Sequence, residues 1–173
     1  MTKIINTVLS TAALLLCVSM AFAEKSDRNK PIEVEADSAS LDQQRNLMVY
    51  EGNVIVTQGS LRLKAAQVTV KENEKGQQFA VATGSPATFR QRLDGGKDEW
   101  VEAQAKRIEY DSAKEIVTLI DNARAKRNQD MVMGQLIVYQ AKTGTFQVSG
   151  GKKSANPSSG RVTVILQPKP DTP

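Results

Sequence analysis

Side chains able to carry out catalysis are scarce in this chain of 173 residues. It contains no histidine, and its single cysteine, Cys17, lies in an apolar N-terminal segment. Imidazole acid–base chemistry, thiol catalysis and the usual zinc ligand sets are therefore excluded for the rest of the chain. The glycine motifs of hydrolase nucleophile elbows, phosphate-binding loops and dinucleotide-binding folds do not occur either.

The charged groups that remain are two carboxylate pairs and two basic groups: Glu72 with Glu74, Asp98 with Glu99, Arg124-Lys126-Arg127, and Lys152-Lys153. Both carboxylate pairs fall in charged loops, where solvation explains them better than acid–base catalysis. The basic groups carry the charge that meets phosphates. The alternation of Arg124 and Lys126, however, is more typical of the water-facing side of a strand. We therefore expect neither an enzyme nor a metal or cofactor site.

Medium-sized aliphatic residues at alternate positions form the more informative pattern, because alternate residues share one face of a β-strand. With few aromatic residues to fill a core, this face has two explanations. Residue types alone favour a closed core between two sheets, and the other explanation is an apolar groove for flexible acyl chains. The period of two places the following pairs on one face: Ile32 and Val34, Val54 and Val56, Leu61 and Leu63, Val68 and Val70, Ile108 and Tyr110, Val117 and Leu119, Leu136 and Val138, Phe146 and Val148, and Val162 and Val164.

Short strand patterns separated by turn-forming residues carry these pairs. In the best example, Tyr50–Val70, two strand patterns flank a turn at 57–60, and the small-residue step Lys64-Ala65-Ala66 leads into a third. By composition, 103–115 is the one candidate helix. Its apolar residues Ile108 and Tyr110 have strand spacing, however, so we predict a strand there as well.

A small-residue step followed by a strand recurs four times along the chain. The steps begin at Ala36, Ala65, Ala105 and Gly134, at intervals of 29, 40 and 29 residues, so the two halves are related by a period of 69. Small residues let a strand bend, and stacked copies cover each other's apolar faces. We predict an all-β stack that bends at the same place on each pass. Corner and turn residues repeat as well: Gly52-Asn53, Gly84-Ser85 and Asp121-Asn122, and Asp42 with Asp111.

The first 23 residues have the features of an export signal. Lys3 gives a positive start, an apolar segment follows, and Ala21-Phe22-Ala23 is an A-x-A cleavage signal before Glu24. The alternative is an uncleaved membrane anchor over residues 4–23. We expect cleavage after Ala23, with the mature protein in the periplasm.

Cleavage would remove the only cysteine, so disulfides are not available to the mature protein. It would also remove Lys3 and lower the net charge from +4 to +3, which is too small and dispersed to indicate nucleic acid binding. We divide the remaining chain into a flexible lead-in at 24–30, one β domain at 31–166 and a flexible, proline-rich tail at 167–173.

The β domain resembles the OstA-like family of periplasmic lipopolysaccharide transport proteins. The run Gly52–Gly59 (GNVIVTQG) is the most specific match, and Asp121-Asn122 departs from the family's Gly-Asn corner. The resemblance implies a twisted, partly open β-jellyroll of stacked short antiparallel strands with a V-shaped cross-section. It rests on five segments: Pro31–Asp37, Ser40–Asp42, Tyr50–Gly59, Pro86–Phe89 and Ile108–Tyr110.

The same resemblance implies a non-enzymatic function, the transfer of lipopolysaccharide across the periplasm with the acyl chains of lipid A held in the apolar interior. It implies LptC at the inner membrane, LptD at the outer membrane and head-to-tail copies of the chain as partners. Edge strands would make these contacts. By position in the family's motifs, the expected acyl-chain contacts are Ile32, Val34, Leu41, Tyr50, Phe89, Ile108 and Tyr110.

Two alternatives remain open at this point. One is a membrane-tethered member of the same family, of the LptC type, with residues 4–23 as its anchor. The other is a purely structural β scaffold that binds no lipid.

Overall fold

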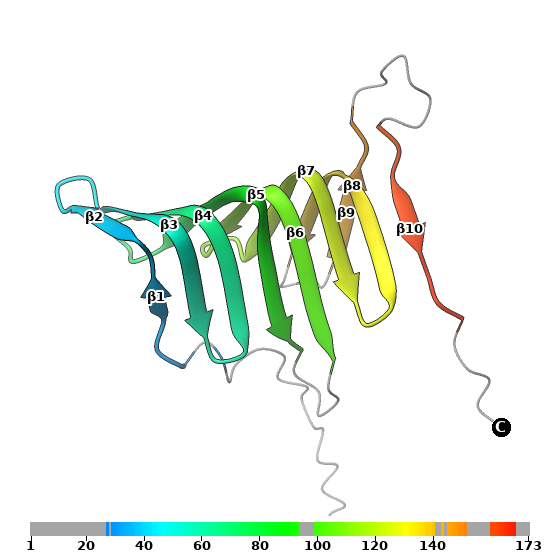
Figure 1. Ribbon diagram of the computed structural model, residues 1–173, viewed down its shortest axis with the longest axis horizontal. Coiled ribbons are helices and arrows are strands. Elements are labelled where there is room, and N and C mark those ends of the chain that lie inside the picture. Colours follow the sequence, from blue (N-terminus) through cyan, green and yellow to red (C-terminus); the bar gives the residue numbers. More distant parts are fainter. Residues whose placement is uncertain are drawn as a thin grey trace, which may run out of the picture.

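A computed structural model describes residues 27, 29–93, 99–140, 143, 145–151 and 160–168. Within these residues ten strands form one sheet with antiparallel neighbours (Figure 1). The all-β prediction is therefore confirmed, including the strand in place of a helix at 103–115. The strands are β1 (Glu33–Glu35), β2 (Ser38–Asp42), β3 (Leu47–Gln58), β4 (Leu61–Glu72), β5 (Gln78–Arg92), β6 (Trp100–Asp111), β7 (Ile116–Arg127), β8 (Asp130–Gln140), β9 (Thr145–Ser149) and β10 (Thr163–Ile165).

Some sequence predictions concern residues outside this description. The expected export signal at 1–23 lies wholly outside the described residues. The lead-in at 24–30 and the tail at 167–173 lie partly outside them.

Six long strands, β3 to β8, form the body of the sheet in chain order, and short strands flank them at both ends. β1 and β2 both pair with β3, and β9 and β10 both pair with β8. Each end of the stack is therefore formed by two short strands that pair with different halves of the same long strand.

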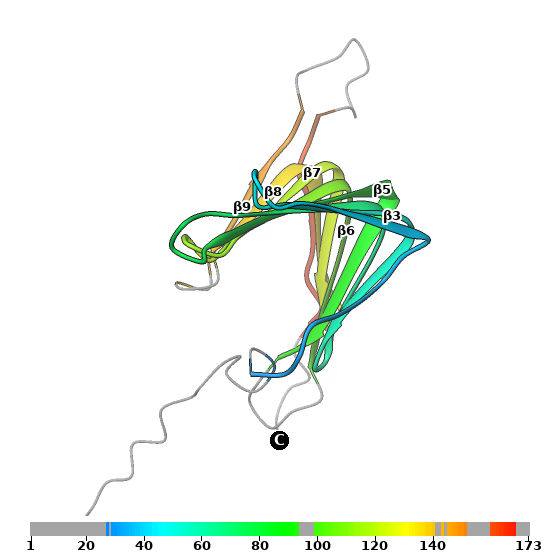
Figure 2. The ribbon, with the colours of Figure 1, turned by 90° about the vertical axis from the view of Figure 1, so that its left-hand side faces the viewer.

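Each long strand bends near its middle, and the bend divides the sheet into two arms. The lower arm holds β1, β10 and the half of β3 that follows Asn53, and the upper arm holds β2, β9 and the half before Gly52. Figure 2 looks along the stack and shows the arms meeting as a V. The strand pairing shifts at the bends, as at Glu51/Val54, Lys64/Gln67 and Ile120/Ala123.

The predicted small-residue steps lie at these bends, so the expected place of bending is confirmed. The short patterns on the two sides of a bend are halves of one strand, however, and Gly84-Ser85 lies inside β5. Gly52 and Asn53 in β3 and Asp121 and Asn122 in β7 have positive φ, a left-handed conformation that glycine, asparagine and aspartate tolerate best.

Three rows of side chains, each continuous from strand to strand, line the inside of the V. The lower row is Val34, Val56, Leu63, Phe89, Ala103, Ala125, Val132 and Val164. The upper row is Ala39, Tyr50, Val68, Ala82, Ile108, Leu119, Ile137 and Val148. The rim row, farther from the bend in the upper arm, is Leu41, Met48, Val70, Ala80, Tyr110, Val117, Tyr139 and Phe146.

Small side chains at the apex of the V let the two arms meet. Ala87, Ala105 and Ala123 are 0%, 1% and 2% exposed, and Val54 beside them is 1% exposed. Apart from Ala39 and Val164 at the ends, the residues of the lower and upper rows then belong to one packed cluster. Larger side chains farther from the apex need more room between the arms, which explains why the V opens towards its rim.

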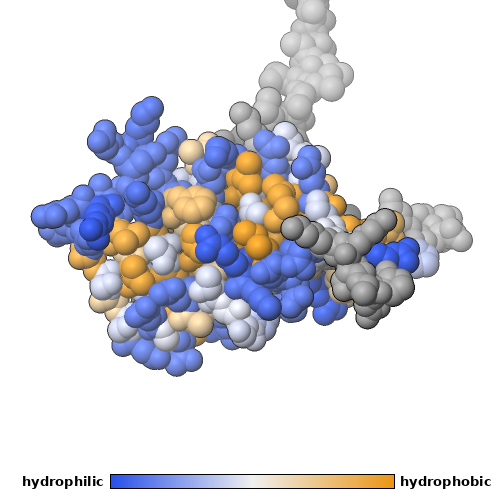
Figure 3. Space-filling model, turned by 90° about the horizontal axis from the view of Figure 1, so that it is seen from above, coloured by the Kyte–Doolittle hydropathy of each residue, from blue (hydrophilic) through white to orange (hydrophobic). Residues whose placement is uncertain are grey.

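The prediction for β8 was wrong about the face. Leu136 and Val138 lie on the outside of the upper arm, because their neighbours Ile137 and Tyr139 pair with the inward residues of β7. β8 is apolar on both faces here, so alternation alone did not distinguish them. Seen from above, the outside of the upper arm accordingly mixes apolar and polar side chains (Figure 3).

Candidate binding face

Six of the seven residues expected to contact a ligand lie in the three inner rows. Val34 and Phe89 belong to the lower row, Tyr50 and Ile108 to the upper row, and Leu41 and Tyr110 to the rim row. The seventh, Ile32, precedes β1 and is 56% exposed. Residues up to 76 positions apart in the sequence, Val34 and Tyr110, thus lie on one concave face.

Exposure along this face rises with distance from the apex. Ile108 in the upper row is 4% exposed, whereas Tyr110, two residues along β6, is 37% exposed. Leu41 and Phe146, at the two ends of the rim row, are 59% and 44% exposed. The deep rows therefore pack against the opposite arm, and the rim row faces the opening.

Sequence reasoning missed some rim residues that complete the row. Tyr139 stacks on Phe146 with ring centres 4.3 Å apart, and Met48 lies between Leu41 and Val70. Tyr139 was missed because the neighbouring Leu136 and Val138 had been given the inner face. The register of β7 against β8 would have found it, since Val117 pairs with Tyr139.

Polar contacts hold the lead-in against the tip of the lower arm, beside the β3–β4 turn. The carboxylate of Asp27 accepts hydrogen bonds from the Ser60 hydroxyl, from the Ser60 backbone N–H at 3.1 Å and from Gln91 Nε2 at 3.3 Å. Burial raises the pKa of Asp27, but the Ser60 and Gln91 hydrogen bonds and the charge of Arg92 outweigh this and hold it below its ordinary value of 3.8. Asp27 thus fastens the lead-in to the turn.

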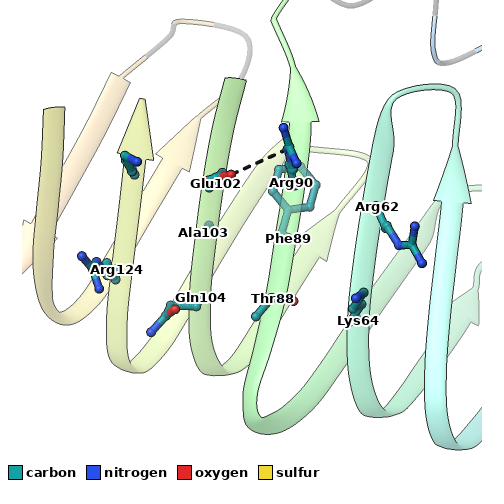
Figure 4. Close-up of a pocket in the computed structure, with 10 residues that line it drawn as sticks. Arg62, Lys64, Thr88, Phe89, Arg90, Glu102, Ala103, Gln104 and Arg124 are labelled. Atoms are coloured by element: carbon teal, nitrogen blue, oxygen red, sulfur yellow. Dashed lines mark ion pairs between the residues drawn. The ribbon is translucent and has the colours of Figure 1, made fainter. Parts of the chain in front are cut away.

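A separate hollow of about 610 Å³ lies on the outside of the lower arm, over β4 to β7 (Figure 4). Its polar lining residues occupy positions alternate to the inner rows, so the hollow and the inside of the V are on opposite faces of the sheet. Ten residues line it: Arg62, Lys64, Thr88, Phe89, Arg90, Glu102, Ala103, Gln104, Arg124 and Lys126.

The described part of the chain offers little for catalysis. No group of three or more His, Cys, Asp or Glu residues there is placed to hold a metal ion. Among the same residues, every buried side-chain nitrogen or oxygen has a hydrogen-bond partner. No helix within the described ranges is both long and apolar enough to span a membrane.

A single bent antiparallel sheet with an apolar concave face defines this protein as an open β-jellyroll. Residues 33–145 match the family model described as LptA/(LptD N-terminal domain) LPS transport protein. The chain belongs to this family. The family consists of non-enzymatic transport proteins, which agrees with the chemistry predicted from the sequence.

Individual relatives match over nearly the full chain. The lipopolysaccharide export system protein LptA of Haemophilus influenzae is 36% identical over 94% of this chain and 92% of its own length. The protein of the same name from Escherichia coli K12 is also 36% identical, over 95% of this chain and 85% of its own length.

A solved structure supports the fold independently. It is the crystal structure of LptH, the LptA-homologous periplasmic component of the lipopolysaccharide transport device of Pseudomonas aeruginosa. The two chains superpose with a TM-score of 0.73 at 33% identity, over 83% of this chain and 99% of LptH. The prediction of an OstA-like open β-jellyroll is therefore confirmed.

Proposed function

We propose that the chain is the periplasmic bridge component of lipopolysaccharide export, and that it holds lipid A acyl chains inside the V. Family membership supports the transport of lipopolysaccharide in the periplasm. The observation that carries the acyl-chain assignment is the continuity of the inner rows, which run without a charged residue from one end of the sheet to the other.

Such a face suits flexible hydrocarbon. Each methylene moved from water into apolar contact contributes about 0.8 kcal/mol, so even partial insertion of an acyl chain is favourable. The rim row is the point of entry, because Leu41, Tyr110 and Phe146 are already exposed. Deeper insertion requires the arms to part, since Ile108 and Ile137 are packed in the free protein. The sugars of the ligand remain in water at the opening.

The ends of the stack suit partners that add strands. β1 and β2 at one end and β9 and β10 at the other are short edge strands, and each edge has backbone groups free to pair with another chain. We assign to these edges LptC at the inner membrane, LptD at the outer membrane and further copies of this chain. Such contacts join unlike ends, so they propagate into filaments instead of closing.

Site-specific photocrosslinking tests the acyl-chain assignment. A benzophenone amino acid replaces Phe89 in the lower row or Tyr110 in the rim row, and both positions already hold an aromatic ring. Glu109 is the matched control, because it neighbours Tyr110 in β6 but lies on the outer face. We expect lipopolysaccharide adducts at positions 89 and 110 and none at 109.

Adducts at position 109 with none at 89 and 110 would refute an internal acyl site. A purely structural scaffold would give no adducts at any of the three positions and no rise in melting temperature with lipopolysaccharide, whereas a binder gains stability by mass action.

The N-terminus of the native protein distinguishes the tethered alternative. Mass spectrometry should find a chain that begins at Glu24, and an intact residue 1 or 2 would favour the tether.

A further inference from the structure

The outside of the lower arm carries two cross-strand rows of polar side chains, here called the basic rows. The first is Arg62, Arg90, Glu102 and Lys126, and the second is Lys64, Thr88, Gln104 and Arg124. Neighbouring strands are about 4.8 Å apart, so five cations and one carboxylate share a small area. In Figure 4 these side chains come from four consecutive strands around the hollow.

Most of the positive charge of the basic rows is not neutralised within the protein. Arg62 lies directly opposite Arg90 in the β4–β5 ladder, an arrangement of like charges that destabilises a sheet. The one carboxylate, Glu102, pairs with Arg90 at 3.6 Å. Among the described residues Arg62, Lys64 and Lys126 form no ion pair. An anionic ligand would therefore relieve a repulsion that the fold retains.

The hollow between these cations has the size and lining of a site for a small polar ligand. Its volume of about 610 Å³ falls within the range of small-molecule sites, about 300–1,000 Å³. Thr88 and Gln104 add neutral hydrogen-bonding groups between Lys64 and Arg124 in the second row. At its edge the guanidinium of Arg90 lies 3.9 Å from the ring centre of Trp100, which fixes the orientation of that arginine.

We propose that this hollow binds a phosphorylated saccharide. Arginine guanidinium groups match phosphate oxygens in a forked geometry, and threonine and glutamine side chains suit sugar hydroxyls. A membrane surface would fit less well, because a concave site with neutral polar residues among its cations offers a bilayer few contacts. The inner rows lie on the opposite face of the sheet, so this site does not depend on the acyl-chain assignment.

A titration of the mature chain with acyl-free saccharide tests the proposal. Fully deacylated lipopolysaccharide with its phosphates retained is added while backbone amide signals are followed by NMR. We expect shifts confined to the lower-arm halves of β4 to β7. The double variant Arg62→Gln/Lys126→Gln should bind about tenfold more weakly or worse, since hydrogen bonds to charged groups are among the strongest. Neither residue packs inside the V.

Two controls make the result specific. Lys71→Gln/Lys75→Gln removes the same charge from the upper arm and its adjoining loop and should bind as the wild type does. A dephosphorylated saccharide should bind far more weakly. If both double variants bound the saccharide equally weakly, general charge attraction would explain the binding and the proposal would be overturned. Equal binding of the dephosphorylated saccharide would also overturn the proposal.

The remaining outcomes separate this site from other sources of binding. Binding of anionic phospholipid vesicles that depends on Arg62 and Lys126, without saccharide binding, would assign the face to a membrane surface instead. No binding of any probe would refute the site. The acyl crosslink at Tyr110, which does not line the hollow, should persist in Arg62→Gln/Lys126→Gln, so this proposal can fail while the internal acyl site holds.

Discussion

Asp27 shows how one carboxylate can organise an end of the molecule. It accepts three hydrogen bonds from the β3–β4 turn and from β5, and it approaches Gly59 so closely that an added Cβ there would lie 2.1 Å from its Oδ1. Gly59 also has positive φ. The turn is thus shaped to receive the lead-in, and a larger residue at 59 would exclude it.

The hydrogen bonds to Asp27 predict a pH dependence of this contact. Because the pKa of Asp27 is depressed in the folded protein, its contribution to stability is complete above the ordinary value of 3.8 and is lost as pH falls through the lower folded value. We expect the Ser60 amide proton signal to titrate with a midpoint below 3.8, as measured by NMR. In Asp27→Asn this titration should disappear; a midpoint at or above 3.8 in the wild type would contradict the contact.

At the residue scale, the sequence predicted which side of a strand faces inwards better than how deeply a side chain is buried. Ile108 and Tyr110 share one alternation pattern, yet one packs between the arms and the other reaches the opening. Depth depends on distance from the apex, which no single strand encodes. The contact of Asp27 was not predicted either, because a polar lead-in carries no apolar pattern to indicate where it docks.

At the scale of elements, the period of 69 residues is repeated in the backbone itself. Residues with positive φ occur in pairs at this spacing: Asn46 and Glu115, Gly52 and Asp121, Asn53 and Asn122, and Gly59 and Asn128. The turns match as well, since Asp42 accepts a bond from the backbone N–H of Arg45 and Asp111 accepts one from that of Lys114. β7 therefore repeats the backbone of β3, although Asp121 replaces glycine.

The small residues at the apex predict a steep dependence of stability on side-chain size. Ala87→Leu would insert bulk where the arms meet, and overpacking of this kind costs about 1–3 kcal/mol. Ala80→Leu is the matched control in the same strand, because Ala80 lies in the wider rim row. Urea denaturation should show a clear loss for Ala87→Leu and less than about 1 kcal/mol for Ala80→Leu. Similar losses in both would mean that the apex is no narrower than the rim.

The features of the strands that could be predicted are those with a local signal in the sequence. Small residues at regular intervals predicted the bends correctly, because a strand needs small residues at the position where it bends. Alternation failed at β8, where Leu136 to Tyr139 are all apolar and only pairing with β7 selects the face. The junctions at Gly52-Asn53 and Gly84-Ser85 were interpreted as breaks between strands, because a bulge inside a bent strand uses the same residues as a turn.

At the scale of the whole molecule, the end strand β10 is held by few contacts. β10 pairs with β8 over three residues, and all three of its residues are exposed. Removal of residues 161–173 should therefore leave the six long strands folded while weakening association between copies. Sedimentation at increasing protein concentration measures this, with a chain ending at residue 168 as the control. Unchanged association without β10 would exclude it from the contact.

Continuity of the inner rows has a consequence for movement along the protein. Because the backbone of β3 recurs in β7, the backbone geometry repeats every four strands, about 19 Å at the usual strand spacing. The inner side chains differ between the repeats, with Val56 and Tyr50 in β3 and Ala125 and Leu119 in β7, but none of them is charged. A hydrocarbon chain inside the V would therefore meet no charged barrier along the sheet. Such a path permits diffusion in both directions. Net direction would then come from loading at one end and removal at the other.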